Sequence, residues 1–577
     1  MLKRMAFLLV LVVPFGYLAC SRPSDRTPVV LTGIVSSEAE GPMGGVLVKV
    51  KGLGTNLTVA VVSDDQGLYA FPSDALQDGR YYVDVRAAGY DIDNQGWIEV
   101  SSERTTSLDL KLEKTQHLSA QLTDAEWLLS VPGTQKQKEV LFRCVPCHTL
   151  LPVIQSKHGP EDFLTVLNRM RQYAPAAFRL KPVNLPYDVP GAPPSAEELL
   201  KSIPEASRIP DDLYPTGYGI SFSGAQGRRE DAYFAQYLSA VNLSSAKEWE
   251  YELNTLPRPS GRATRVIITE YDLPRPESQP HDAAVDSEGM VWYTDFALPY
   301  LGRLDPQTGE VKEWRVPLTK PGFPEGSLDI EFDEEGNPWI ARLFQAALAR
   351  FDKKTEKFTT WSVPEEYDSD RLRTGFFGFA PDGSALFLAG SGVVRIDPQA
   401  NRVTASPFTV PDGYSGFFYG VSVDSKGKLF GAGMVDGAIG EFDAETNRMI
   451  MYPTPTPNSG PRRLHMDDED RLWIAEFYAH KLAMFDTTTK EFKEWDIPTS
   501  WSGPYDVVVD RNGEVWGGGM HTDRIFRFNP ETEQFTEYLL ASSTNIRRID
   551  VDNSTDPVSV WIGSNHHAKI VRVQPLD

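Results

Sequence analysis

The sequence predicts a multidomain, mainly β protein: a small β-sandwich, then an α-helical domain, then a seven-bladed β-propeller. Apolar runs with period-two alternation, broken by Gly, Asp and Pro, fill residues 29–113. Apolar residues at helical spacing mark residues 118–243. A repeated pattern fills residues 266–577. A chain of 577 residues is also longer than a single hydrophobic core normally supports.

The first 20 residues indicate a targeting segment rather than a folded element. Lys3 and Arg4 precede an apolar run at Ala6–Val13 that is too short to span a bilayer. The run leads to Cys20 in a pattern that resembles a bacterial lipoprotein signal. Tyr17 stands where that pattern prefers Leu, so ordinary signal cleavage remains the alternative. We therefore expect an exported protein, periplasmic or at the cell surface, held to the membrane only by a lipid anchor at Cys20.

Residues 29–113 read as a small antiparallel sandwich of short strands. The stretch SDDQGLYAF followed by GRYYVDVRAAGY resembles the carboxypeptidase regulatory-like domain, which has a prealbumin-like sandwich fold. This resemblance implies a fold and no activity, and the stretch contains no catalytic grouping. We expect the domain to act as a spacer or docking module.

Two of the three cysteines lie in the stretch FRCVPCHTL, where Cys144, Cys147 and His148 form a C-x-x-C-H motif. A zinc site usually needs a second C-x-x-C pair, and a redox disulfide needs a thioredoxin-like context, but the sequence offers neither. The motif is the signature of c-type haem: both thiols bond the vinyl groups and the histidine binds the iron. We therefore expect one covalent haem c at these three residues.

The surroundings of the motif resemble a monohaem cytochrome c domain over residues 118–243. QKQKEVLFR reads as a short helix, and Glu230–Leu243 reads as an amphipathic helix similar to the last helix of such domains. That family usually takes a distal methionine from the loop before this helix, but here the only methionine is Met170, in EDFLTVLNRMRQY. We expect Met170 as the sixth iron ligand. His158, His117, an open site and a plain core position for Met170 remain alternatives.

The C-terminal part repeats one pattern: TEYDLP returns as KEWRVP, TTWSVP and KEWDIP, and clear neighbouring copies are 43 or 47 residues apart. The aromatic positions of the pattern are Tyr271, Trp314, Trp361, Tyr452, Trp495 and Tyr538. Four short antiparallel strands in each repeat are typical of a propeller blade, and residues 266–577 suffice for seven. The strand at Val266–Leu273 should complete the last blade by pairing with Ala568–Val573, which would leave no open edge.

The wording ITEYDLP, PHDAAVD and LGRLD resembles virginiamycin B lyase and its streptogramin lyase-like relatives. The resemblance implies that a histidine opening an inner strand acts as base and that carboxylates hold Mg²⁺. Here His281 opens a strand and Asp295 ends the next one. The start of one antiparallel strand lies beside the end of the next, so both side chains are expected at one mouth of the channel.

The later blades depart from the lyase pattern. The histidine and acidic positions hold Arg462 with Glu476, then Tyr505 with Gly519, and then approximately Arg547 with Ser564. The candidate catalytic residues are therefore His281, Asp295 and Glu476, and Mg²⁺ is a weaker candidate than haem. A structural role, in which His281 caps its strand and bonds Asp295, is the alternative. The histidines expected in loops are His465, His480, His521, His566 and His567.

Charge and motifs together limit the function. The chain has 57 basic and 80 acidic residues, a net charge of −23, which argues against nucleic acid as a partner. We interpret the chain as an electron-transfer protein, with a redox protein as partner and the propeller as a binding platform for a partner or a small molecule. The alternative is an enzyme: a metal-assisted lyase, or another activity at the propeller mouth, with the cytochrome as an accessory.

Overall fold

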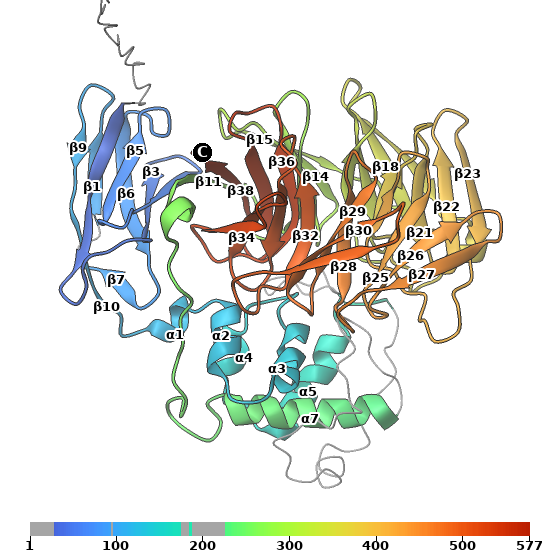
Figure 1. Cartoon of the computed structure of the whole chain (residues 1–577), viewed down its shortest axis with the longest axis horizontal. Coiled ribbons are helices and arrows are strands. Elements are labelled where there is room, and N and C mark those ends of the chain that lie inside the picture. The colour runs from blue at the N-terminus through green and yellow to red at the C-terminus, as the bar shows by residue number, and fades with distance from the viewer. Residues whose placement is uncertain (1–27, 94–95, 175–183, 187–224) are drawn as a thin grey trace, which may run out of the picture.

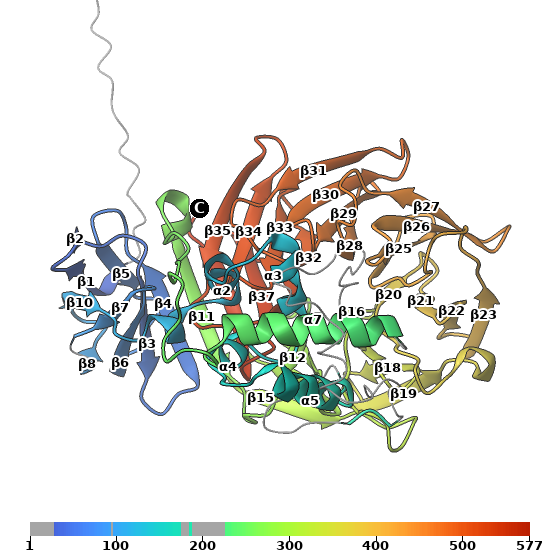
Figure 2. The same cartoon turned by 90° about the horizontal axis from the view of Figure 1, so that it is seen from below.

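The computed structural model describes residues 28–93, 96–174, 184–186 and 225–577. The expected signal segment with Cys20, and most of the proline-rich stretch before Ser195, lie outside these residues. The chain is mainly β, with a sandwich at residues 28–114 and propeller-like sheets at residues 266–577, called the propeller region below (Figure 1). Between them, a helical segment lies against one face of the propeller region (Figures 1 and 2).

Six antiparallel four-stranded sheets follow one another along the propeller region. They are β12 (Pro280–Val285), β13 (Val291–Asp295), β14 (Tyr300–Leu304) and β15 (Val311–Arg315); β16 (Ile330–Phe332), β17 (Pro338–Arg342), β18 (Ala347–Asp352) and β19 (Lys357–Ser362); β20 (Phe377–Phe379), β21 (Ala385–Ala389), β22 (Gly392–Asp397) and β23 (Arg402–Pro407); β24 (Val421–Val423), β25 (Leu429–Gly433), β26 (Ala438–Asp443) and β27 (Arg448–Pro453); β28 (Pro461–Met466), β29 (Arg471–Glu476), β30 (Lys481–Asp486) and β31 (Phe492–Asp496); β32 (Pro504–Val509), β33 (Val515–Gly519), β34 (Arg524–Asn529) and β35 (Gln534–Leu539). The short helix η3 (Glu365–Tyr367) precedes the third sheet.

A repeated aspartate–tryptophan contact explains much of the sequence repeat. In the first sheet, the Asp286 side chain accepts backbone N–H groups of Glu288 and Met290, and the Trp292 indole donates to the same carboxylate at 2.8 Å. The pairs Asp333–Trp339, Asp467–Trp473 and Asp510–Trp516 make the same indole bond at 3.0, 2.9 and 2.9 Å. The aspartate closes the turn between two strands while the indole fills the core between sheets, so one spacing serves both purposes.

The seventh sheet joins both ends of the propeller region. It consists of β36 (Ile546–Asp552), β37 (Ser559–Ser564), β38 (Lys569–Pro575) and β11 (Val266–Asp272). Strand β11 pairs with β38 from Val266 opposite Pro575 to Asp272 opposite Lys569, which is the expected pairing.

The outer edge of β11 is not left open. It pairs with β4 of the sandwich, with Ile267 opposite Val61 and Tyr271 opposite Leu57, so one eight-stranded sheet runs from β36 to β8. Lys51 bonds Asp272 at 2.5 Å across this junction. The sequence predicts a last blade that ends at β11, but the sandwich extends this sheet by one more strand and beyond. An edge strand has unpaired backbone N–H and C=O groups, which can bond to another strand of matching register.

The sandwich contains β1 (Val29–Ser37), β2 (Gly41–Pro42), β3 (Leu47–Gly52), β4 (Leu57–Val62), β5 (Leu68–Pro72), β6 (Gly79–Arg86), β7 (Tyr90–Ile92), β8 (Gly96–Val100), β9 (Thr106–Ser107) and β10 (Leu110–Lys114). Its apolar core includes Val35, Val48 and Phe71, all 0% exposed. The expectation of a purely antiparallel sandwich was wrong in one respect: β1 pairs in parallel with both β9 and β10. A crossover connection allows this, and period-two alternation alone does not reveal strand direction.

The helices are α1 (Leu118–Gln121), α2 (Asp124–Ser130), α3 (Gln135–Glu139), η1 (Val140–Arg143), α4 (Leu151–Ile154), α5 (Pro160–Arg171), α7 (Ala225–Val241) and η2 (Gly261–Thr264). Capping boxes start α2 at Thr123 and α3 at Thr134, each with its N3 side chain bonding back. The core of this segment is continuous with Phe477, Tyr505 and Met520 of the propeller region. Helices and sheets therefore share apolar surface rather than merely touching.

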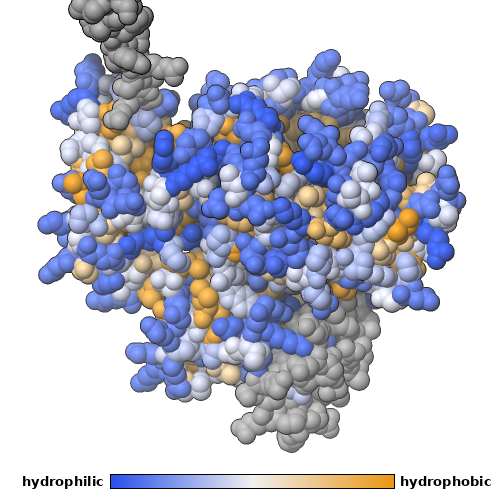
Figure 3. All heavy atoms as spheres, viewed as in Figure 1, coloured by the Kyte–Doolittle hydropathy of each residue, from blue (hydrophilic) through white to orange (hydrophobic). Residues whose placement is uncertain are grey.

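The surface fits the composition. Hydrophilic residues cover most of the face in Figure 3, with hydrophobic residues in small patches. In the part of the chain described, no helix has the length and apolar character to cross a membrane.

Candidate functional site at the mouth of the propeller region

A repeated bulge places side chains at the end of the central channel. The first strands of four sheets begin with Pro280, Pro461, Pro504 or Ile546, and each pairing register shifts after that residue. The next residues are His281, Arg462, Tyr505 and Arg547. A β-bulge changes the direction of the side chains at its own position and leaves the strand pairing beyond it intact. The positions matched by counting along the repeat are therefore equivalent in the structure as well. These four residues and Tyr419 are called the mouth layer below.

The centre of the mouth layer is a hydrogen-bonded chain. His281, which is 0% exposed, bonds the Asp282 carboxylate through Nδ1. Its Nε2 lies 3.2 Å from the Tyr505 hydroxyl, which is 2.5 Å from the Tyr419 hydroxyl. A carboxylate only accepts, so Nδ1 of the neutral imidazole carries the proton and Nε2 accepts from Tyr505.

Burial keeps this imidazole neutral. It lowers the pKa of His281 to about 4, although Asp282 acts in the opposite direction. Burial alone would raise the pKa of Tyr419, but the Arg462 guanidinium, helped by Arg547, brings it below its usual value. The mouth layer therefore combines a neutral base with a phenol that ionises more readily than usual, the two linked through Tyr505.

Two arginines lie beside these hydrogen-bonded side chains. The Arg462 guanidinium lies 3.9 Å from the centre of the Tyr505 ring and 4.3 Å from that of Phe477. The Arg547 guanidinium lies 5.3 Å from the centre of the Tyr505 ring. Arg462 is 0% exposed and Arg547 is 1% exposed, so both charges act in a region of low dielectric.

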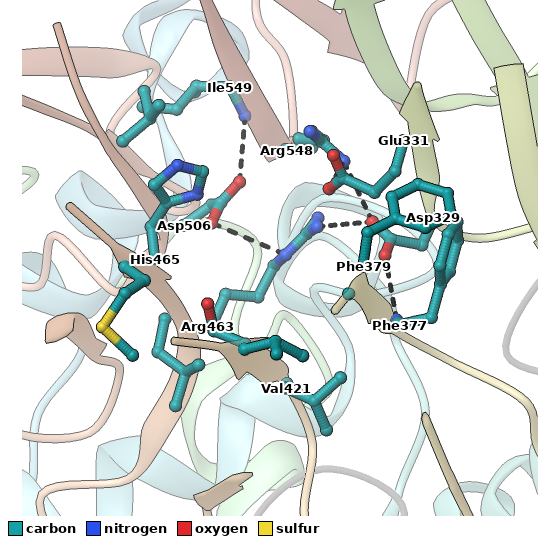
Figure 4. A pocket seen from close by; sticks show the side chains of 17 residues that line it. Asp329, Glu331, Phe377, Phe379, Val421, Arg463, His465, Asp506, Arg548 and Ile549 are labelled. Atoms are coloured by element: carbon teal, nitrogen blue, oxygen red, sulfur yellow. Dashed lines mark hydrogen bonds and ion pairs between the residues drawn. The ribbon is translucent and has the colours of Figure 1, made fainter. Parts of the chain in front are cut away.

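Behind the mouth layer, a charged cavity of about 210 Å³ occupies the channel (Figure 4). Arg463 donates to Asp282 at 3.0 Å and to Asp329 at 2.7 Å, and Arg548 donates to Asp329 at 3.0 Å. Burial raises the pKa of Asp329 well above its usual value. The cavity thus has its charges tied to one another across the sheets, as Figure 4 shows for Arg463, Asp329 and Asp506.

The predicted partners of His281 lie in other contacts. Asp295 pairs with Arg275 at 3.0 Å and accepts the backbone N–H groups of Ala297 and Leu298. Glu476 is 0% exposed, and neither of its carboxylate oxygens has a hydrogen-bond partner among the described residues. Burial raises the pKa of Glu476 to about 8, so the carboxyl binds a proton at neutral pH.

These contacts bear on the Mg²⁺ expectation. Asp295 is engaged with Arg275 and turn amides, and a protonated Glu476 is a poor ligand for a hard cation. In the described part of the chain, no group of three His, Cys, Asp or Glu side chains converges as a metal site requires.

The C-x-x-C-H motif forms one helical turn. The N–H groups of Cys147 and His148 both donate to the Cys144 carbonyl, at 3.2 and 3.3 Å, and both cysteines are thiols. Nδ1 of His148 lies 2.7 Å from the Thr149 carbonyl. A carbonyl only accepts, so this contact places the proton on Nδ1, the tautomer in which a histidine binds a metal through Nε2. The residues present therefore fit a c-type haem.

The other iron-ligand candidates lie farther along the helices. Met170 is near the end of α5 and is 38% exposed, so the alternative that it is a core residue was wrong. His158 is exposed and packs edge-on against Phe163, and His117 is exposed at the start of α1.

The C-x-x-C-H turn lies against the mouth layer. Phe142, just before it, stacks on His521 with ring centres 4.7 Å apart and meets Phe477 edge-on at 5.7 Å. The backbone N–H of Ala125 donates to the His521 carbonyl at 2.8 Å. The mouth layer therefore lies beneath the helical segment.

Sequence analysis missed several of these contacts. Phe142, His521 and His566 have no distinguishing motif, and only their meeting in space gives them a role. His465 was expected in a loop but lies in β28 (Pro461–Met466), because its strand continues past the bulge. His480 and His521 do lie in turns, as expected.

Two models of known protein families match parts of this chain. Residues 403–576 match the virginiamycin B lyase family. Residues 30–113 match the carboxypeptidase regulatory-like domain. The first match supports the lyase resemblance over residues 403–576 of the repeat region, and the second confirms the resemblance of the sandwich.

Several solved structures are similar to part of this chain. A streptogramin B lyase has 22% identity and a TM-score of 0.48, covering 55% of this chain and 100% of its own. Virginiamycin B lyase from Staphylococcus aureus has 19% identity and a TM-score of 0.47, covering 54% and 100%. An extracellular domain from B. thetaiotaomicron has 16% identity and a TM-score of 0.41, covering 51% and 40%. No curated protein sequence matches this chain.

Proposed function

We propose that this chain is an exported monohaem c-type cytochrome whose haem domain is seated on a lyase-like, closed seven-bladed propeller, and that it transfers electrons to or from a redox partner protein. One observation carries the proposal. One turn carries both thiols and the His148 imidazole, whose proton is on Nδ1, and this turn lies against the mouth layer.

Each residue of the motif has a defined task. The thiols of Cys144 and Cys147 would hold the haem vinyl groups, and Nε2 of His148 would bind the iron. Met170 is the proposed sixth ligand. A thioether in that position would raise the reduction potential relative to a second imidazole. When bound, the haem supplies one-electron transfer.

The propeller region is proposed as a binding platform for a partner or a small molecule. His281 and Tyr505 are both 0% exposed beneath the helical segment, which supports a covered mouth rather than an open catalytic pocket. The proposed lipid anchor at Cys20 and the export of the chain rest on its first residues.

Covalent haem is the direct test. The full chain, produced in a host with c-type haem maturation, should retain haem on a denaturing gel and show a reduced spectrum with c-type bands. Cys144→Ser with Cys147→Ser should lose the covalent haem completely. Haem-free wild-type protein from that host would refute the proposal.

The axial ligand is tested separately. Met170→Ala should remove the thioether-to-iron charge-transfer band at the red end of the visible spectrum and lower the reduction potential, while His158→Ala should change neither. If only His158→Ala alters spectrum and potential, the iron has two histidine ligands.

The second candidate is lyase-type or metal-assisted chemistry, for which His281, Asp295 and Glu476 were the expected residues. Its support is the neutral His281 imidazole, whose Nε2 accepts from Tyr505 beside the low-pKa Tyr419. Mg²⁺-dependent turnover that depends on His281 would favour this candidate.

A further inference from the structure

Three side chains of the propeller region hold the C-x-x-C-H turn at Cys144–His148, called the haem-binding turn below after its proposed function. Nη2 of Arg547 donates to the Pro146 carbonyl at 2.8 Å, and Nε2 of His566 donates to the Val145 carbonyl at 3.0 Å. Nδ2 of Asn545 donates to the same Val145 carbonyl at 3.4 Å. Val145 and Pro146 are the two residues between the cysteines. Asn545, Arg547 and His566, which all come from the seventh sheet and the turns flanking its strands, are called the socket below.

The socket also fixes the direction of the Arg547 side chain. Its Nε donates to the Asn545 side-chain oxygen at 2.6 Å, and its guanidinium lies 5.7 Å from the Phe296 ring. A guanidinium stays charged at any physiological pH, and the Asn545 side chain and the Phe296 ring orient it. Arg547 is 1% exposed, so water screens this charge poorly.

The charge of Arg547 reaches the haem-binding residues. The Pro146 carbonyl that Arg547 holds lies between the two cysteines, next to Cys147 and two positions before His148. The guanidinium is therefore within hydrogen-bond distance of the turn that carries both thiols and the imidazole.

We infer that Arg547 is a positioning residue of the proposed haem site: the propeller fixes the haem-binding turn through it and raises the reduction potential through its buried charge. The inference rests on the proposed function. Reduction of the iron adds one electron and removes one positive charge from the site, so a fixed nearby cation stabilises the reduced form. In this view the propeller region helps to set the potential of the haem.

The test is the midpoint potential of haem-loaded full chain carrying Arg547→Gln, Arg547→Lys or Arg572→Gln. Arg572 is a matched control because it lies in the same sheet but contacts Ser559 and Trp561 instead of the turn. Arg547→Gln should shift the reduction equilibrium about tenfold toward the oxidised form, which is about 59 mV for one electron. Arg547→Lys should shift it less because the charge remains, and Arg572→Gln should leave it unchanged.

A second measurement does not depend on haem. In the haem-free Cys144→Ser, Cys147→Ser background, Arg547→Gln or His566→Ala should loosen the turn and speed proteolysis of residues 135–150, whereas Arg572→Gln should not. A haem-loaded Arg547→Gln protein with wild-type potential overturns the inference, as do unchanged cleavage rates. Absence of covalent haem in the wild type instead refutes the proposed function, so the two failures are distinguishable.

Discussion

The sandwich and the helical segment are both attached to the propeller region, but the two attachments have different chemistry. The sandwich continues a sheet: β4 bonds to β11 through backbone groups, with ion pairs such as Lys51–Asp272 at the margin. The helical segment is held mainly by side chains, with Phe142 in an aromatic pocket and the socket on the C-x-x-C-H turn.

The two attachments are expected to respond differently to amino-acid substitutions. A backbone ladder tolerates most substitutions that keep a strand, so the β4–β11 junction is a rigid mount. A side-chain contact depends on particular residues and carries charge, so the mouth contact is able to tune chemistry. The following predictions test that contrast, starting with the largest effect.

Deleting Val266–Asp272 should abolish the native fold. The deletion removes the last strand of the seventh sheet and the mount of the sandwich together, exposing the edges of β38 and β4, so we expect aggregation in size-exclusion chromatography. Removing residues 28–113 is the control: β11 keeps its pairing with β38, and the propeller region should stay folded. A deletion protein that is monomeric with unchanged melting temperature would contradict this account.

Phe142→Ala should weaken the helical attachment by about 3–5 kcal/mol, the usual cost of truncating a buried phenylalanine. Phe142 is 3% exposed against the rings of His521 and Phe477. Hydrogen exchange should accelerate in the Met520–Asp523 turn. The control is Phe163→Ala, a residue 2% exposed within the helices, which should loosen the helices without that signature. Equal protection of the turn in both variants would show that Phe142 is not an anchor.

Glu476 should make the propeller region less stable as pH rises. Its pKa is raised from 4.5 to about 8 in the folded chain, so the folded state holds a proton that the unfolded chain releases. Stability from this group is full below about pH 4.5 and falls by about 1.4 kcal/mol per pH unit up to about pH 8. Denaturant unfolding of Glu476→Gln should lack this slope, and Glu491→Gln, at an exposed position, should keep it. Parallel pH profiles for Glu476→Gln and wild type would disprove the assignment.

Streptogramin ring opening should be weak or absent, the smallest effect expected. His281 is 0% exposed, and the base positions of the last blades hold Tyr505 and Arg547, whose phenol and guanidinium are poor bases at neutral pH. Assays with and without Mg²⁺ provide the measurement. Robust Mg²⁺-dependent turnover that His281→Ala abolishes would favour the enzyme over the electron-transfer protein.

Much of the fold was predictable because it rests on local periodicity. The Asp–Trp spacing and the aromatic repeat mark the sheets, and the bulged slots follow from counting residues between copies. The site was predictable only in part. His281, Arg462, Tyr505 and Arg547 were identified as equivalent positions, but the partner of His281 is its neighbour Asp282 rather than Asp295. A bulge decides which neighbour faces inward, and sequence spacing does not reveal it.

The C-x-x-C-H motif and the repeat can both be read from the sequence alone. Cys144, Cys147 and His148 are adjacent in the chain, and the blade strands pair with near neighbours, so short-range order suffices for both. Only the tertiary structure decided that β4 extends the seventh sheet and that Arg547 holds Pro146. These contacts join residues 200 to 400 positions apart. No local preference specifies them; they form because one surface buries the apolar and polar groups of another.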